Sequence, residues 1–126
     1  MKKTARPIWF IIVLALLSLA LYACSGSSKA AQFPTGKFTN AGNDIYTYEF
    51  RADNTWSYYT GGLMAAKGTY KIDGNTWIEQ GTPECPFTGS YTWTYDGKNL
   101  TFKLKDSDGC APRKEATDGQ TFTLVQ

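Results

Sequence analysis

From residue 33 to the C-terminus, apolar and polar side chains alternate with a period of two. The clearest example is a pair of runs at 90–95 and 100–105; in the first, Tyr91, Trp93 and Tyr95 alternate with serine and threonine. Because successive side chains of a β-strand point to opposite faces, the alternation predicts strands with one aromatic face. The Asp96-Gly97 pair between the runs predicts a hairpin, since glycine tolerates the positive φ angle of a tight turn.

The same alternation predicts eight short strands separated by turn-forming residues. They cover 35–40, 45–51, 54–60, 66–72, 76–80, 90–95, 100–105 and 121–125, and a single helical turn is expected near 113–117. The predicted inward side chains are Phe38, Tyr46, Tyr48, Phe50, Trp56, Tyr58, Tyr70, Ile72, Tyr91, Trp93, Tyr95, Leu100, Phe102, Leu104, Phe122 and Leu124. The fifth strand is too short to decide between Trp77 and Ile78. One polar and one aromatic face per strand favours an all-β fold, an eight-stranded antiparallel up-and-down β-barrel.

The first 23 residues have a different composition and predict a signal peptide. Lys2, Lys3 and Arg6 precede an uncharged, mostly apolar run at 8–23. This run is shorter than the roughly 20 residues of a typical membrane span and is typical of a signal-peptide core. An uncleaved N-terminal anchor is the alternative, and both interpretations place the remaining chain outside the cytoplasmic membrane.

The run ends in Leu21-Tyr22-Ala23-Cys24, which resembles the lipobox of bacterial lipoproteins, although Tyr22 stands where a small or aliphatic residue is usual. The resemblance implies cleavage before Cys24 and lipidation of its thiol, with palmitate among the acyl chains. We therefore expect a lipid anchor to the cell membrane or outer membrane, a flexible tether at 24–33 and a barrel domain at 34–126. Ser25, rather than aspartate, after the cysteine would direct a lipoprotein of a diderm host to the outer membrane.

Lipidation of Cys24 leaves Cys85 and Cys110 as a possible pair in an oxidising compartment. In an up-and-down barrel, alternate connections lie at the same end. The odd-numbered connections at 41–44, 61–65, 81–87 and 106–120 are predicted to be the long ones, and two of them contain the cysteines. The topology thus places both cysteines at one rim and predicts a disulfide there.

Charge and composition argue against several classes of function. The chain has 13 Lys plus Arg, 11 Asp plus Glu and no histidine. Three of the basic residues belong to the predicted signal peptide, so the mature chain is slightly acidic and gives no reason to expect nucleic-acid binding. Without histidine there is no His-based triad, and nothing marks Glu79 and Glu84 as a glycosidase pair. We expect a non-enzymatic monomer without metal or cofactor.

A set of motifs resembles one known family. Gly36-Lys37-Phe38 resembles the Gly-x-Trp signature of lipocalins, with phenylalanine for tryptophan. The further pattern Cys85, Gly89-Ser90-Tyr91-x-Trp93, Asp96-Gly97, Leu100-x-Phe102 and Asp108-x-Cys110-x-x-Arg113 is similar to small lipocalin-like domains of bacterial secreted and lipid-anchored proteins. The resemblance implies a barrel open at the end with the odd-numbered connections, and binding of small, mostly apolar ligands.

Two interpretations of the barrel interior are open. In the first, it holds a ligand near the long-loop rim, lined by Tyr46, Tyr48, Trp56, Tyr58, Tyr70, Tyr91 and Trp93. In the second, these rings fill a narrow barrel, and the protein acts through its loop rim as a protein-interaction or inhibitor module. The apolar stretch 61–66 is either a lid or partner-contact patch, or a loop that folds Leu63 and Met64 over the barrel end.

Arg113 also has two interpretations. It could recognise an anionic ligand, or it could close the barrel beneath an aromatic ring, as the C-terminal arginine of lipocalins does. Asp106, Asp108 and Glu115 are its candidate partners.

Overall fold

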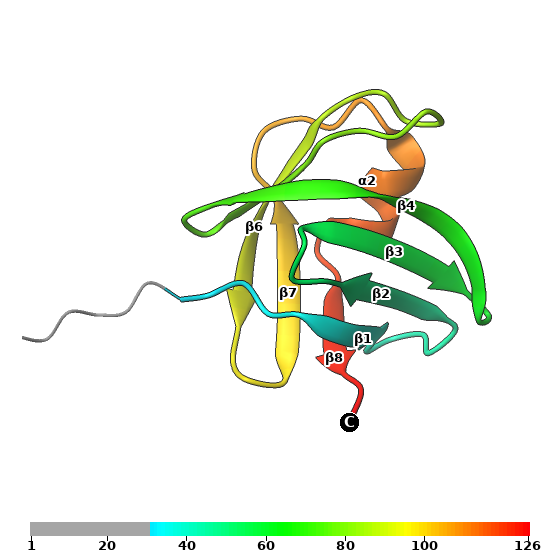
Figure 1. Cartoon of the computed structure of the whole chain (residues 1–126), viewed down its shortest axis with the longest axis vertical. Helices are drawn as coiled ribbons and strands as arrows, with labels where there is room; N and C mark the ends of the chain where they lie inside the picture. The colour runs from blue at the N-terminus through cyan, green and yellow to red at the C-terminus, as the bar shows by residue number, and fades with distance from the viewer. Residues whose placement is uncertain (1–30) are drawn as a thin grey trace, which may run out of the picture. The chain divides into compact units, whose positions relative to one another are not determined.

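The predicted strands close into a barrel in the computed structural model, which describes residues 31–126 (Figure 1). The elements are β1 (Gly36–Asn40), β2 (Tyr46–Phe50), β3 (Thr55–Thr60), β4 (Leu63–Asp73), β5 (Thr76–Glu79), β6 (Gly89–Tyr95), β7 (Asn99–Leu104), α2 (Ala111–Thr117) and β8 (Thr121–Leu124). Each strand pairs antiparallel with the next, and β1 pairs with β8 to complete the circle. The predicted all-β, eight-stranded antiparallel barrel is confirmed.

The first strand begins with the Gly36-x-Phe38 motif, and both residues have structural reasons to be there. Gly36 has a φ angle of +128°, which favours glycine, and a Cβ at this position would lie 3.2 Å from Leu124 Cδ1. Phe38 is completely buried and pairs with Leu124 across the β1–β8 seam. The motif therefore sits where the barrel closes on itself.

Aromatic rings fill the barrel interior. The buried core comprises Phe33, Phe38, Tyr48, Phe50, Trp56, Tyr70, Trp77, Tyr91, Trp93, Leu100, Phe102 and Phe122. Trp77 faces inward and Ile78 does not join this core, which answers the register question left by the short fifth strand. Tyr46, also predicted to point inward, lies at the rim and is only half-buried.

Phe33 closes one end of the barrel. We assigned it to the tether, but it is only 7% exposed, and its ring centroid lies 5.1 Å from that of Phe50 and 5.2 Å from that of Trp93. Because it precedes β1, it enters at the end where the tight even-numbered turns lie. The compact unit that contains the barrel begins at Ala31.

One predicted loop is wrong. The stretch 61–65 is not a long connection, because Gly61 and Gly62 form a tight turn with φ angles of +56° and +80°, and β4 begins directly at Leu63. Leu63 and Met64 are 78% and 56% exposed, so they extend along a hairpin and do not fold over the barrel end.

Strand β4 is much longer than its partner β5. It has 11 residues against 4, and β5 pairs only with its second half, from Tyr70 to Asp73. On its other side β4 pairs with β3, with a register shift between Tyr58 and Tyr59 that leaves Ala65 without an opposite residue. The first half of β4 is therefore bonded on one side only among the residues that the structure describes.

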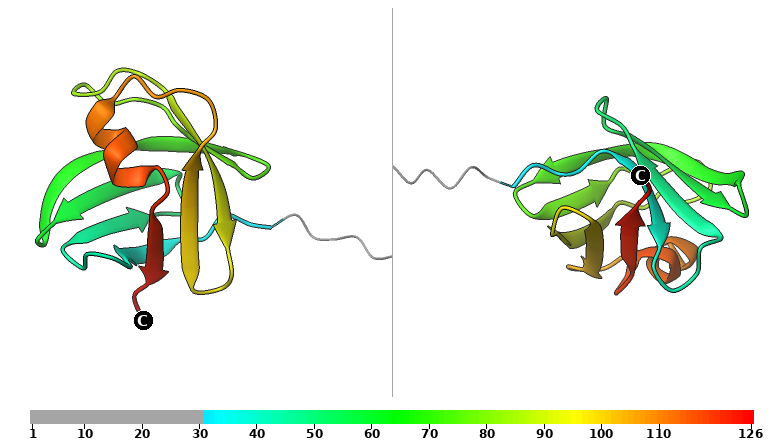
Figure 2. Two further views of the ribbon diagram at one scale, coloured as in Figure 1. Left: turned by 180° about the vertical axis from the view of Figure 1, so that it is seen from behind. Right: turned by 90° about the horizontal axis from the view of Figure 1, so that it is seen from below.

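The remaining odd-numbered connections gather at the end opposite Phe33, together with helix α2 (Figures 1 and 2). The predicted helical turn at 113–117 is this helix, which begins two residues earlier and carries Pro112 in its first turn, where a missing N–H does no harm. Within residues 31–126 no helix has the length and apolar character that crossing a membrane requires. The predicted signal peptide, lipidated Cys24 and most of the tether lie outside the described residues.

Candidate ligand-binding site

A cleft lies between helix α2 and the strands that face it, and we call it the α2 pocket. Its volume is about 290 Å³, at the small end of the roughly 300–1,000 Å³ typical of ligand pockets. Its lining residues are Tyr48, Trp56, Tyr58, Ala65, Ala66, Thr82, Glu84, Cys85, Cys110, Pro112, Arg113 and Ala116. Aromatic and small side chains predominate, with one acidic and one basic residue among them.

The aromatic wall of the α2 pocket comes from adjacent strands. Tyr48 on β2 lies with its ring centroid 4.7 Å from that of Tyr58 and 5.9 Å from that of Trp56, both on β3. The Tyr48 hydroxyl lies 3.0 Å from Thr117 Oγ1 and so ties this wall to the end of α2. Burial raises the pKa of Tyr48, so the phenol is neutral at physiological pH. The result is a rigid, uncharged aromatic surface.

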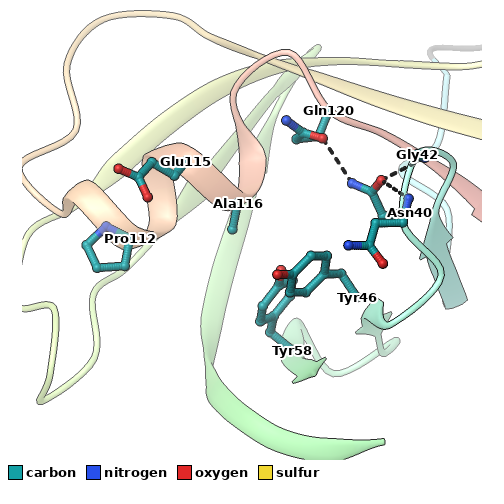
Figure 3. A pocket seen from close by; sticks show the side chains of 9 residues that line it. Asn40, Gly42, Tyr46, Tyr58, Pro112, Glu115, Ala116 and Gln120 are labelled. Carbon is teal, nitrogen blue, oxygen red and sulfur yellow. Dashed lines mark hydrogen bonds between the residues drawn. The ribbon is translucent and has the colours of Figure 1, made fainter. Parts of the chain in front are cut away.

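A second, more polar cleft of about 500 Å³ adjoins the first (Figure 3). The two share Tyr58 and residues of α2. Tyr46 stacks on Tyr58 with ring centroids 6.0 Å apart and an interplanar angle of 11°. Opposite the rings, Asn40 Nδ2 donates a 3.0 Å hydrogen bond to Gln120 Oε1, while Asn40 Oδ1 accepts one from the backbone N–H of Gly42 at 2.8 Å. The Asn40 and Gln120 side chains of this cleft are thus bonded to each other.

The seven predicted ligand-binding aromatics divide into two groups. Four of them line the two clefts: Tyr46, Tyr48, Trp56 and Tyr58. The other three lie in the packed core and line neither cleft: Tyr70, Tyr91 and Trp93. Tyr70 donates a hydrogen bond to the Arg51 carbonyl at 3.1 Å, far from α2. The deep interior is thus filled, and space for a ligand lies at the α2 end.

Arg113 is the hub of a buried ion-pair cluster beside the α2 pocket. It pairs with Glu79 on β5 through Nη1, and with Asp108 through two contacts, Nε–Oδ2 at 2.6 Å and Nη2–Oδ1 at 2.5 Å. Nη2 also donates to the Phe87 carbonyl at 2.6 Å. Every guanidinium nitrogen therefore already has a protein acceptor, which leaves Arg113 a structural residue without a free edge for an anionic ligand.

The partners of Arg113 were predicted only in part. Asp108 was one of three candidates, whereas Asp106 and Glu115 are exposed and do not pair with it. Glu79, which the sequence did not assign to Arg113, is completely buried. Its inward position follows from Trp77, since side chains two residues apart in a strand share a face. Arg113 accordingly closes the α2 end through carboxylates and not by lying beneath an aromatic ring.

Asp108 is held by more than Arg113. Its Oδ2 accepts a 2.5 Å hydrogen bond from the Tyr91 hydroxyl, and its Oδ1 accepts one from the Cys110 backbone N–H at 2.8 Å. Burial and then the hydrogen bond to Asp108 raise the pKa of Tyr91. Gly89 gives the cluster its room, because a Cβ there would lie 2.5 Å from Asp108 Oδ2 and 2.8 Å from Arg113 Nε. The Gly89-Ser90-Tyr91 motif thus serves the ion-pair cluster.

The predicted disulfide between Cys85 and Cys110 is present, with a Cα–Cα distance of 5.6 Å. Both cysteines line the α2 pocket. The bond joins the β5–β6 connection to the residue that precedes α2, so it fixes the helix over the barrel end. The inference that alternate connections share one rim is confirmed for this pair.

In the part of the chain that the structure describes, no group of three or more histidine, cysteine, aspartate and glutamate side chains is arranged to hold a metal ion. Comparison of the chain with protein-family models, with curated proteins and with solved structures found no match.

Proposed function

We propose that this chain is a lipid-anchored, lipocalin-like protein of the bacterial cell envelope that binds a small apolar or amphipathic molecule in the α2 pocket. The α2 pocket carries the proposal: an aromatic wall of Tyr48, Trp56 and Tyr58 faces small side chains across about 290 Å³. Apolar walls with a few polar groups are the usual composition of small-molecule sites. The ligand must be small, because aromatic rings fill the interior beneath the pocket.

The resemblance of 21–24 to a lipobox supports the anchoring part of the proposal. Labelled palmitate should be incorporated into the expressed chain and lost in a Cys24→Ala variant. Label retained by the variant would show that a residue other than Cys24 is acylated, and would contradict the proposed anchor.

Native mass spectrometry of protein purified from its own host tests the binding part. We expect a small molecule to accompany the folded chain and to be lost from an Ala66→Trp variant, because the larger side chain occupies the α2 pocket. A matched Ala41→Trp variant, at an exposed turn outside the pocket lining, should retain the molecule. A native chain without any adduct, and without binding to a panel of small amphipathic compounds, would contradict the proposal.

A protein-interaction module is the second candidate, and the β3–β4 hairpin favours it. Leu63 and Met64 are exposed there, and nearby Ile45, whose carbonyl accepts a 2.8 Å hydrogen bond from the Gly61 N–H, is 45% exposed. Exposed apolar side chains near the tip of one hairpin are candidates for contact with a partner. Crosslinking in host membranes should capture a protein partner that a Leu63→Ser/Met64→Ser variant loses, and loss of the partner only with α2-pocket variants would contradict this assignment.

A further inference from the structure

The buried ion-pair cluster beside the α2 pocket does not balance its charge. Arg113 supplies one positive charge, while Glu79 and Asp108 each supply a carboxylate. Asp108 has both oxygens hydrogen-bonded and meets Arg113 through two contacts. Glu79 contacts Arg113 through Oε2 only, and its Oε1 has no hydrogen-bond partner among the described residues. Of the two carboxyl groups, Glu79 is therefore the less fully paired, although its side chain has no solvent exposure.

The unpartnered oxygen lies next to the wall of the α2 pocket. A Cβ on Gly68 would be 3.1 Å from Glu79 Oε1 and 3.0 Å from Trp56 Nε1, so both atoms lie beside the same inward face of Gly68. Trp56 lines the pocket, and its Nε1 likewise has no partner among residues 31–126. A buried carboxylate of this kind is costly unless a cation or hydrogen-bond donors reach it.

The rest of the α2 pocket reinforces the negative field. Glu84 lies on its wall, and Arg113, the basic residue of the lining, directs its guanidinium nitrogens to Glu79, Asp108 and the Phe87 carbonyl. The faces of Trp and Tyr rings also attract cations, through the ring quadrupole. Acidic groups and aromatic faces both favour a positively charged ligand.

We propose that the ligand of the α2 pocket carries a positively charged, hydrogen-bond-donating group, such as a primary ammonium, on a short apolar body. The ammonium lies against the Trp56 side of the pocket, where it meets the field of Glu79 and Glu84, and the apolar body lies along Tyr48 and Tyr58. This inference rests on the proposed function, since it names the class of ligand for the same site.

Three probes of equal length separate charge from apolar binding: n-hexylammonium, 1-hexanol and hexanoate. The protein is the full chain in the form that cells produce after processing. Binding is measured by isothermal titration calorimetry and by the ¹⁵N–¹H signal of the Trp56 indole, and detergent without protein serves as the blank. We expect n-hexylammonium to bind about tenfold more tightly than 1-hexanol, as a cation–π contact and an added charge interaction would produce. Hexanoate should bind more weakly than 1-hexanol.

Glu79→Gln and Glu84→Gln should each weaken the binding of n-hexylammonium more than the binding of 1-hexanol, and so reduce the preference for the ammonium probe. Asp73→Asn is the matched control, because it removes one exposed carboxylate at the far end of the barrel. If Glu79→Gln does not fold, Glu84→Gln at the pocket wall provides the same test. Melting temperatures confirm that each variant is folded.

Equal binding of all three probes would overturn the ligand class and leave the proposed function standing. An ammonium preference that survives both glutamine variants would overturn the assignment to these carboxylates. If none of the probes binds and no molecule co-purifies with the native chain, the proposed function fails as well.

Discussion

Replacing Arg113 with methionine should destabilise the barrel more than any exposed charge substitution. The guanidinium is the partner of Glu79 and Asp108, and its side chain is only 6% exposed. Methionine keeps most of the apolar stem but leaves the two buried carboxylates without their cation. Removing one partner of a buried pair typically costs about 3–5 kcal/mol. For a domain of this size we expect the melting temperature to fall by about 15–30 °C.

The assay is chemical denaturation at pH 7 alongside thermal melting, with Arg51→Met as the matched control. Arg51 also pairs with a glutamate, Glu49 at 2.7 Å, but its side chain is 38% exposed, so its loss should cost less than about 1 kcal/mol. Equal losses for the two variants would refute the reasoning.

Three further predictions concern other parts of the barrel. The Cys85–Cys110 disulfide closes a loop of 25 residues, and reducing it should lower the free energy of unfolding by about 3 kcal/mol. Reductant should therefore lower the melting temperature of the native chain but not that of a variant with alanine at both positions. Phe33→Ala should cost about 3–5 kcal/mol in denaturant unfolding, whereas Ile45→Ala at an exposed position should stay within about 0.5 kcal/mol; equal costs would contradict the role of Phe33 in the core. Backbone N–H groups, foremost that of Asn99, lower the pKa of Asp96 below its usual 3.8. The ionised carboxylate therefore stabilises the turn fully above pH 3.8, and this contribution is lost as the pH falls through the lowered pKa of the folded state. NMR titration should find its midpoint below 3.8.

The barrel was predictable because the alternation of apolar and polar residues that indicates its strands is local and recurs along the chain. Alternation predicted all eight strands, apart from the first residues of β4, since a side chain such as Trp93 must face the same way as Tyr91 whatever the tertiary structure. The disulfide was predictable because the lipobox accounts for Cys24 and the other two cysteines lie in connections that share an end of the barrel. The register of the fifth strand was not local, and only the pairing of β5 with β4 and β6 decides that Trp77 points inward.

The errors arose where a residue's environment depends on distant parts of the chain. Phe33 precedes the first strand and belongs to no alternating run, yet its ring packs against those of Phe50, Tyr70 and Trp93. The stretch 61–65 is predicted as a long connection, whereas Gly61 and Gly62 make a tight turn and β4 begins at Leu63. The partnership of Glu79 with Arg113 joins residues 34 apart and becomes visible only when α2 is placed over the barrel.

The unequal lengths of β4 and β5 also bear on the self-association of this protein. The first half of β4 presents backbone groups on the side away from β3, and a free strand edge invites another chain to add a strand. Two features work against such growth. Ala65 is the extra residue at the register shift with β3, which interrupts regular spacing, and Lys67 places a charge on the exposed edge. We therefore expect Lys67→Val to promote aggregation at concentrations where the native chain stays dispersed.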